Sequence, residues 1–243
     1  MHIPDGFLDP KVSMGMMGVA VAVFSYSLAK MKEVVTALQP VTALAAAGKS
    51  VGSMAGGMRR ILTKDGERTI YKLVMVVVLV FVVQMFDFTV INGTTGHIMG
   101  GMLAALILGP FVGAIAMSIV LITQAFFLAD GGVLALGANI VSMVLFGTII
   151  PFYLYSFCKK IIPEWAAILF AGWLSLPLAA LACALEISLS GQAPISVIVP
   201  AMLKVHLLIG VAEALFTFSL LKIYRLIINE QELMGTILED SNI

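Results

Sequence analysis

The first residues of the chain carry its clearest metal-binding chemistry. The amine of Met1, the backbone amide nitrogen of His2 and the imidazole Nδ1 of His2 can close two fused chelate rings on one metal ion. These nitrogens lie in a plane, and one imidazole from elsewhere would complete a square. Square-planar nitrogen ligation indicates Ni(II) or Cu(II), with Co(II) as a further option. The alternative is an ordinary translation start followed by a chance histidine.

The next residues have the chemistry of a turn. Pro4 fixes φ, Asp5 can hydrogen-bond its own backbone, and Gly6 allows a positive φ. We therefore predict a tight turn that aims the terminus at another part of the molecule. Residues 1–11 form the predicted N-terminal metal-binding segment.

His97 is the candidate for the missing imidazole. It ends a loop predicted over residues 92–97, and Gly93 and Gly96 leave the backbone there free to bend toward another segment. The alternative is a solvated loop histidine without a role.

Two further polar residues are candidates for holding a ligand in place. Asp130 could accept a hydrogen bond from a ligand imidazole and fix its tautomer, or it could cap the helix that follows its turn. Asn139 could orient a ligand, although we favour a hydrogen bond to the backbone within the bundle.

The last apolar segment carries two ionisable groups, His206 and Glu213, about two helical turns apart on one face. Buried ionisable groups are costly in a membrane and therefore indicate function or a specific partner. We favour a structural polar pair over a proton relay or a contact with another protein. Glu186 lies near the end of its own apolar segment, where we expect it at the membrane interface.

These groups lie in a strongly apolar chain. Hydrophobic residues make up 60% and charged residues 12%, and the mean hydropathy is +1.07. This composition predicts an integral membrane protein. The formal net charge of zero argues against a nucleic-acid partner.

Apolar segments of the length of a membrane span predict an all-α bundle of about seven transmembrane helices in one domain over residues 1–243. The segments are residues 12–29, 71–91, 98–108, 111–129, 133–157, 165–189 and 195–223. Residues 32–70 form a connector on the cytoplasmic side, predicted as a weakly apolar or interfacial helix. Residues 226–243 are predicted to be a solvated cytoplasmic tail.

The distribution of Lys and Arg predicts the orientation in the membrane. If the N-terminus is extracytoplasmic, the basic clusters at 30–32, 59–72, 159–160 and 222–225 all lie on the cytoplasmic side. Only Lys11 and Lys204 dissent, and both lie near span ends where a lysine can snorkel. Met1, His2, His97 and Asp130 then share the extracytoplasmic face. A cleaved signal peptide is the alternative for residues 12–29, but a signal peptide needs a positive leader, and this one holds Pro4, Asp5 and Asp9 with a single lysine.

Four stretches resemble one transporter family. They are MHIPDGF at the start, GHIMGGMLAALILGP over residues 96–110, ADGGVLALGANI over 129–140 and HLLIG over 206–210. They are similar to the substrate-binding membrane subunits, of the CbiM/NikM type, of nickel and cobalt energy-coupling factor transporters. The resemblance covers residue 1 to about residue 225, and the opening motif is its most specific part.

The resemblance implies a metal site and a set of partners. Nickel or cobalt would be the transported substrate, held in a square plane by the Met1 amine, the His2 amide and imidazole, and His97. The N-terminal segment would be inserted into the bundle from the extracytoplasmic side of a prokaryotic cell membrane. The implied partners are a transmembrane coupling subunit, paired cytoplasmic ATPases and, in some systems, a small accessory membrane subunit. The chain itself would be no enzyme and bind no nucleotide, and cobalamin biosynthesis is one context for cobalt uptake.

Three other functions are considered. A related subunit for an organic vitamin would not need a free terminus, and a membrane scaffold would need no site at all. An intramembrane enzyme could use Asp130, Glu186 and His206, but the sequence shows no nucleophile or metalloprotease motif. Blocking the N-terminus separates these hypotheses, since only the metal carrier would lose binding.

Overall fold

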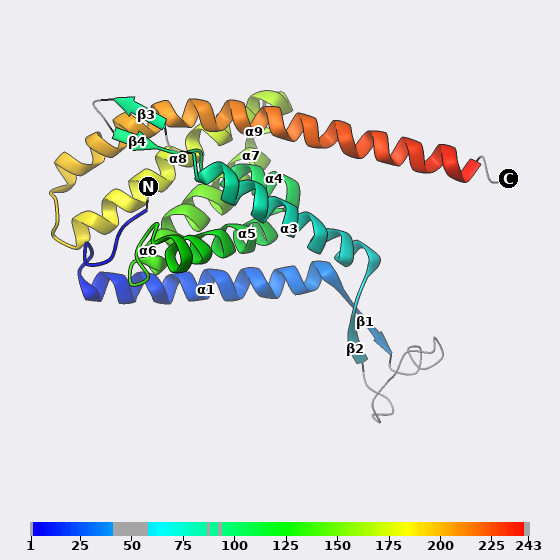
Figure 1. Cartoon of the computed structure of the whole chain (residues 1–243), viewed down its shortest axis with the longest axis horizontal. Helices are drawn as coiled ribbons and strands as arrows, with labels where there is room; N and C mark the ends of the chain where they lie inside the picture. Colours follow the sequence, from blue (N-terminus) through cyan, green and yellow to red (C-terminus); the bar gives the residue numbers. More distant parts are fainter. Residues whose placement is uncertain (1, 41–57, 87, 92–93, 241–243) are drawn as a thin grey trace.

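The structure is a computed structural model that describes residues 2–40, 58–86, 88–91 and 94–240. In this part of the chain the helices form a bundle, and two small hairpins lie at its periphery (Figure 1). The elements are α1 Pro10–Val35, β1 Thr36–Pro40, β2 Met58–Leu62, α3 Lys64–Gln84, β3 Phe88–Ile91, β4 Thr94–Gly96, α4 Gly101–Leu108, α5 Pro110–Thr123, η1 Gln124–Leu128, α6 Leu136–Ile140, η2 Val141–Ile149, α7 Ile150–Cys158, α8 Glu164–Leu189 and α9 Ile195–Asp240. The predicted all-α membrane fold is confirmed.

The helices that are able to cross a membrane differ in how much of their surface the protein buries. Within the described residues, five continuous helical stretches are long and apolar enough: Pro10–Val35, Pro110–Leu128, Leu136–Cys158, Glu164–Leu189 and Ile195–Ile228. The three middle stretches are mostly buried by the protein, whereas α1 and α9 are mostly exposed. The interior therefore consists of α5 with η1, the α6–η2–α7 stretch and α8, and α1 and α9 present apolar side chains for lipid to cover.

Local sequence signals explain where several helices begin. Asp9 caps α1 by accepting from the Lys11 amide at 2.8 Å, and Pro10 occupies the first helical turn. Thr63 caps α3 by accepting from the Gly66 amide at 2.9 Å. Gly109, at φ 81°, separates α4 from α5.

The helix α4 is too short to cross a membrane. At 1.5 Å per residue it extends roughly 12 Å, less than half of a hydrocarbon core. Its first residues are fully buried against η2 and α5. The coil of residues 97–100 that precedes it therefore starts inside the protein, and this places His97 at depth.

The structure corrects three predicted segments. The span predicted at 71–91 begins earlier, at Lys64, and ends at Gln84, while residues 88–91 pair with Thr94–Gly96 in an antiparallel hairpin. Thr89, Val90 and Ile91 are β-branched and precede Asn-Gly, which is a hairpin signal.

The other two corrections concern the predicted connector and tail. The described parts of the connector beyond α1 are strands β1 and β2, paired from Thr36↔Leu62 to Pro40↔Met58, and not a helix. Gly48, Gly52 and Gly56, which are spaced four residues apart within the predicted connector, lie outside the described residues. The tail predicted from residue 226 continues α9 to Asp240.

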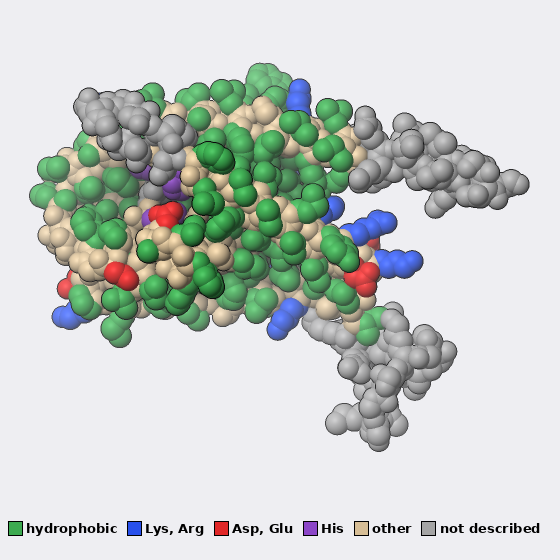
Figure 2. Space-filling model, in the orientation of Figure 1, with side chains coloured by type: hydrophobic (Ala, Val, Ile, Leu, Met, Phe, Trp, Pro, Cys, Tyr) green, Lys and Arg blue, Asp and Glu red, His purple; other side chains and the backbone are tan. Residues whose placement is uncertain are grey.

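Charge is distributed unevenly along the bundle. In Figure 2 the side of the bundle is mostly hydrophobic, and most visible Lys and Arg side chains gather at the end from which α9 projects. The histidines lie toward the opposite end (Figure 2). This distribution of charge is expected of a membrane protein with an apolar belt between two solvent-exposed ends.

Candidate metal centre

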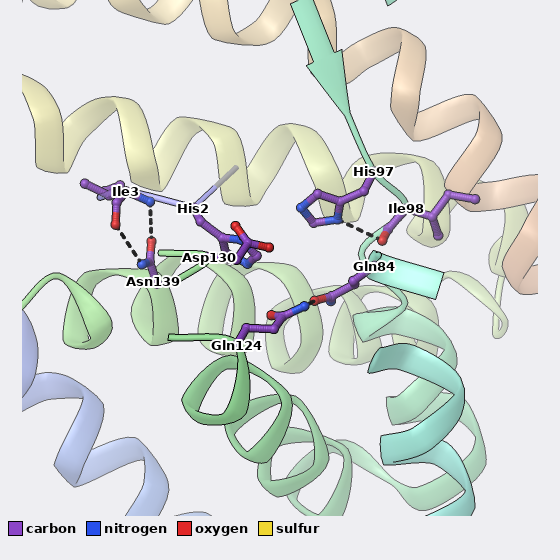
Figure 3. Close-up of polar contacts among 8 residues, drawn as sticks. All are labelled: His2, Ile3, Gln84, His97, Ile98, Gln124, Asp130 and Asn139. Atoms are coloured by element: carbon purple, nitrogen blue, oxygen red, sulfur yellow. Dashed lines mark hydrogen bonds and ion pairs between the residues drawn. The ribbon is translucent and has the colours of Figure 1, made fainter. Parts of the chain in front are cut away.

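The N-terminal segment is hydrogen-bonded to the loop and helix of residues 130–139. Asn139 donates from Nδ2 to the Ile3 carbonyl at 3.1 Å and accepts at Oδ1 from the Ile3 amide at 2.8 Å (Figure 3). The Gly132 amide also donates to the Ile3 carbonyl, at 2.8 Å. The peptide groups on both sides of Ile3 are thus fixed, and these contacts place His2.

Asp5 adds a second anchor on the same loop. Its Oδ1 accepts from the amides of Leu134 and Ala135 at 2.7 and 3.3 Å, just before α6. This is the capping role that the sequence left as an alternative for Asp130. Ile3 and Leu8 pack beside it in an apolar cluster with residues of α6 and α8. The start of the chain is therefore an integral part of the bundle.

Two glycines allow this close approach. Gly131 has φ 88°, and a Cβ there would lie 3.3 Å from Cβ of His2. A Cβ on Gly132 would overlap Asp5. Glycine is needed at both positions because the loop backbone lies directly against His2 and Asp5, with Gly131 also at a positive φ.

His2 lies between Asp130 and His97. Its Nδ1 is 2.7 Å from Oδ1 of Asp130, and its ring centroid is 5.2 Å from that of His97, with 30° between the planes. Because an ionised carboxylate only accepts, His2 donates from Nδ1, and the lone pair is on Nε2. That Nε2 is buried and has no hydrogen-bond partner among the described residues.

The contact with His2 also acts on Asp130. The hydrogen bond from His2 lowers the pKa of the Asp130 carboxyl below its usual value, because it stabilises the charged form. Asp130 is therefore an anionic acceptor against the His2 ring. In this conformation, however, the acceptor contacts the same Nδ1 that a terminal chelate would use.

His97 directly follows β4 and points into the bundle. Its side chain is 8% exposed, and Nδ1 donates to the Ile98 carbonyl at 3.0 Å. This hydrogen bond puts the lone pair of the neutral ring on Nε2. Burial lowers the pKa of His97 to about 3, so the ring is neutral at physiological pH.

A buried polar network holds the turn that follows His97. Glu213 accepts from the Met99 and Gly100 amides at 2.7 and 2.9 Å, and Gln84 donates to the Met99 carbonyl at 2.6 Å. Gln124 in turn donates to Gln84 at 2.9 Å (Figure 3). Helices α9 and α3 and the η1 turn thus fix the segment that carries His97.

The network reaches the loop that carries the partner of His2. The Asp130 amide donates to the Gln124 carbonyl at 3.2 Å. Gln124 therefore contacts both the Asp130 loop, through its backbone, and the His97 turn, through Gln84. Sequence reasoning missed Gln84 and Gln124, although a glutamine in an apolar span is itself a signal.

The structure gives His206 and Glu213 separate partners. His206 donates from Nδ1 to the Met202 carbonyl at 2.7 Å, whereas Glu213 binds the turn after His97. The predicted pairing of these two side chains is absent from the described contacts, because they point to different neighbours. Glu186 also differs from the prediction: it is 2% exposed and accepts from Ser142 at 2.8 Å, and so is not interfacial.

A cavity of about 440 Å³ lies beside these residues. Its polar lining includes His2, His97 and His206, and most of the rest is apolar. In the described part of the chain, no three His, Cys, Asp or Glu side chains are placed to hold one metal ion. A metal in this cavity would need main-chain nitrogens as well. The Met1 amine, which we predict as one of them, lies outside the described residues.

Comparison with known proteins gives a consistent result. A family model described as "Cobalt uptake substrate-specific transmembrane region" matches residues 35–227. The putative fused nickel transport protein NikMN of Archaeoglobus fulgidus is 31% identical over 219 residues, which cover 89% of this chain and 63% of that protein. The putative metal transport protein of Haloquadratum walsbyi is 30% identical, with 89% of this chain and 86% of that protein covered.

The chain spans about three fifths of the length of the fused relatives, 63% and 62% for those of Archaeoglobus fulgidus and Lactiplantibacillus plantarum. Among solved structures, a truncated transition metal transporter is similar, with a TM-score of 0.72 and 25% identity. The match covers 94% of this chain and 99% of the solved one. A second transition metal transporter, 24% identical with a TM-score of 0.73, shows the same fold.

Proposed function

Because this chain belongs to the family described as the cobalt uptake substrate-specific transmembrane region, we propose that it captures Ni(II) or Co(II) for an ATP-driven energy-coupling factor importer. The observation that carries the proposal is the convergence of His2 and His97, whose rings lie 5.2 Å apart although helices α1 and α3 lie between them in the chain. Both histidines line one cavity inside a helical membrane protein.

The proposed site is a square plane of nitrogens. The donors are the amine of Met1, the deprotonated amide and the imidazole of His2, and Nε2 of His97. Such a set suits Ni(II) and accommodates Co(II). Chelation through Nδ1 of His2 requires this ring to turn away from Asp130, since the two are in contact. The neutral state of His97 supports the role, because a metal does not have to displace a proton there.

Asp130 and Asn139 act on the ligands in this proposal. Asn139 binds both peptide groups of Ile3 and thereby fixes the main chain next to the His2 amide. Asp130 competes for the His2 ring and sets its orientation. Groups of this kind usually change metal affinity 10- to 100-fold, roughly, when they are removed.

The remaining parts of the importer are assigned to other chains. We propose a transmembrane coupling subunit, paired cytoplasmic ATPases and an accessory membrane subunit as partners. The relatives whose names describe them as fused nickel transport proteins exceed this chain in length.

Anaerobic titration of Ni(II) and of Co(II) into the purified full chain tests the site. A chain with an unmodified Met1 is compared with one extended by Gly-Ser ahead of Met1 and with His97→Ala. We expect one tightly bound ion per chain in the first and loss of tight binding in the other two, because each loses a proposed nitrogen donor. Equal binding by the native and extended chains would place the site elsewhere.

A further inference from the structure

All the histidines of this chain line one cavity. The sequence has three, and His2, His97 and His206 all belong to the wall of the cavity of about 440 Å³. Two of them belong to the proposed metal site, and the third is left without a role. The three imidazoles of a 243-residue chain all border one largely apolar cavity, and this grouping indicates a shared chemical role.

His206 lies on the more exposed side of this cavity. It is partly exposed, as are its neighbours Met202 and Val205 on α9, and Phe7 beside them is 41% exposed. The opposite wall is buried: Met99 and Met143 are inaccessible and Cys183 is 2% exposed. One cavity thus joins a partly exposed wall, which includes His206, to a buried wall, which includes His97.

The hydrogen bond of His206 leaves a nitrogen donor for a ligand. A carbonyl oxygen only accepts, so Nδ1 donates to the Met202 carbonyl, at 2.7 Å, and the lone pair lies on Nε2. The bond also restrains the ring, because it ties the side chain to the backbone one turn back on α9. A neutral imidazole held in this way is a ready ligand for a transition metal.

A divalent ion needs such a donor on its way into an apolar cavity. It arrives hydrated, and removing its waters between apolar walls is costly unless other ligands replace them. His2 and His97 can do so only at the deep end. A single imidazole near the opening replaces water earlier and lowers the barrier between solution and site.

We propose that His206 is a transient ligand, which binds the incoming Ni(II) or Co(II) through Nε2 and passes it to the site formed by His2 and His97. This inference rests on the proposed function. At His206 only metal–ligand bonds change: water leaves the ion as the imidazole enters, and the imidazole leaves as the final nitrogens bind. As the final site forms, the amide of His2 gives up its proton to water, and the ring proton of His2 moves from Nδ1 to Nε2. His206 is not part of the final square.

A transient ligand has a distinct kinetic signature. Because it stabilises a state that is crossed in both directions, its loss slows association and dissociation by the same factor. The equilibrium constant and the absorption spectrum of the bound metal therefore stay unchanged. A structural residue or a permanent ligand does not give this combination.

Stopped-flow mixing of Ni(II) with the full chain, under anaerobic conditions and with an unmodified terminus, tests the proposal. His206→Asn can keep the hydrogen bond to Met202 but lacks Nε2, and His206→Ala serves as a second variant. Val205→Ala, which alters the same cavity wall without removing a donor, is the matched control. We expect both His206 variants to bind and release Ni(II) roughly tenfold more slowly or worse, equivalent to about 1.4 kcal/mol in the barrier, at unchanged affinity.

The outcomes separate this inference from the proposed function. Wild-type rates in both His206 variants, or slowing as large in Val205→Ala, would overturn the transient ligand while leaving the site intact. A changed spectrum with weaker equilibrium binding would also overturn it, since His206 would then be a permanent ligand. Absence of Ni(II) binding by the unaltered chain would overturn both. Thermal unfolding of each variant shows that the comparison is between folded proteins.

Discussion

At the scale of single residues, the contact between His2 and Asp130 occupies one ring nitrogen of His2. Nδ1 donates to Asp130 at 2.7 Å, Nε2 is buried without a hydrogen-bond partner among the described residues, and the ring centroid lies 5.2 Å from that of His97. Metal binding through Nδ1 exchanges this contact for a metal bond. Asp130 therefore sets both the starting position of the ring and part of the free energy that the metal must overcome.

Replacement of Asp130 by Asn tests this role. Asp130→Asn removes the anionic acceptor that competes with the metal for Nδ1 of His2. We therefore expect the Ni(II) affinity to rise by roughly tenfold, because the metal displaces a weaker, neutral hydrogen bond. Isothermal titration calorimetry on the full chain measures the change. Asp9→Asn is the control, since Asp9 caps α1 and does not contact the site. Unaltered affinity in Asp130→Asn would show that its contact with His2 is only structural.

The burial of His97 makes the free energy of unfolding depend on pH. Its pKa is about 3 in the folded protein, against an ordinary value of 6.5, so below pH 6.5 the unfolded chain binds a proton that the folded chain does not. Stability is therefore lost as the pH falls. Between pH 7.5 and 5.5 the loss from this group is about 1.4 kcal/mol.

Removal of the imidazole isolates this effect. His97→Gln should lose less stability than the unaltered chain between these two pH values. Unfolding in detergent, with a chelator present to exclude metal, gives the two slopes. Identical slopes would mean that His97 titrates in the folded protein near its ordinary pKa.

At the scale of elements, the N-terminal segment and the 130–139 region act as one unit. Their contacts join a segment that lacks regular structure to the start of α6 through the backbone of Ile3 and the side chain of Asp5. The unit depends on Gly132, where a Cβ would meet the Asp5 backbone and side chain.

Gly132→Ala should therefore separate the segment from its loop. Loss of several hydrogen bonds, each worth about 1 kcal/mol, corresponds to a fall in metal affinity of roughly 100-fold. Faster hydrogen exchange at the Ile3 amide would show directly that the segment has come away. Gly18→Ala, at a helical glycine with open space around it, is the comparison. Wild-type exchange at Ile3 in Gly132→Ala would contradict the predicted overlap.

The helices and strands also show which parts of the fold can be predicted from the sequence. Apolar runs located most of the helices, and the boundary predicted between the segments 98–108 and 111–129 coincides with Gly109, because these signals are local. The hairpin of residues 88–96 was missed since its first strand is as apolar as the helix before it. The π-helical stretches η1 and η2 were not predicted either, since residues 124–128 and 141–149 lie within continuous apolar runs.

The residues of the candidate site were likewise predicted only in part from the sequence. His2, His97, Asp130 and Asn139 could be chosen from residue type and position alone, and the structure brings all four to one end of the bundle. The link from Gln124 through Gln84 to Met99 could not, since the partner of a polar residue in a span depends on which helices are neighbours. Glu213 was assigned to the wrong partner for the same reason.

At the scale of the whole molecule, the two ends of the bundle differ. The loop after α8 lies near the N-terminal segment, with which Ala193 and Ile198 share an apolar cluster. The loop before α8, at residues 159–163, lies about 39 Å away along that helix. The positive residues near this second loop predict that it faces the cytoplasm.

Cysteine labelling tests this orientation. In a Cys158→Ser background, Gln192→Cys should react with a membrane-impermeant maleimide added to intact cells, because residue 192 is exposed at the end that holds the metal site. Lys160→Cys, exposed at the opposite end, should react only after the membrane is permeabilised. The reverse pattern would invert the proposed orientation and place the metal site on the cytoplasmic side.

One feature of the fold gives the protein a mechanical property. Helix α9 runs without interruption from Ile195 to Asp240 and carries His206 and Glu213 in its first half, while its last turns project beyond the bundle (Figure 1). At 1.5 Å per residue it is a rod of about 69 Å. If the projecting end tilts as part of a rigid helix, the first half of α9 moves with it. That half carries part of the cavity wall and Glu213, which binds the turn after His97. We therefore expect a force applied to the projecting end to weaken metal binding at the proposed site, although that end lies far from it.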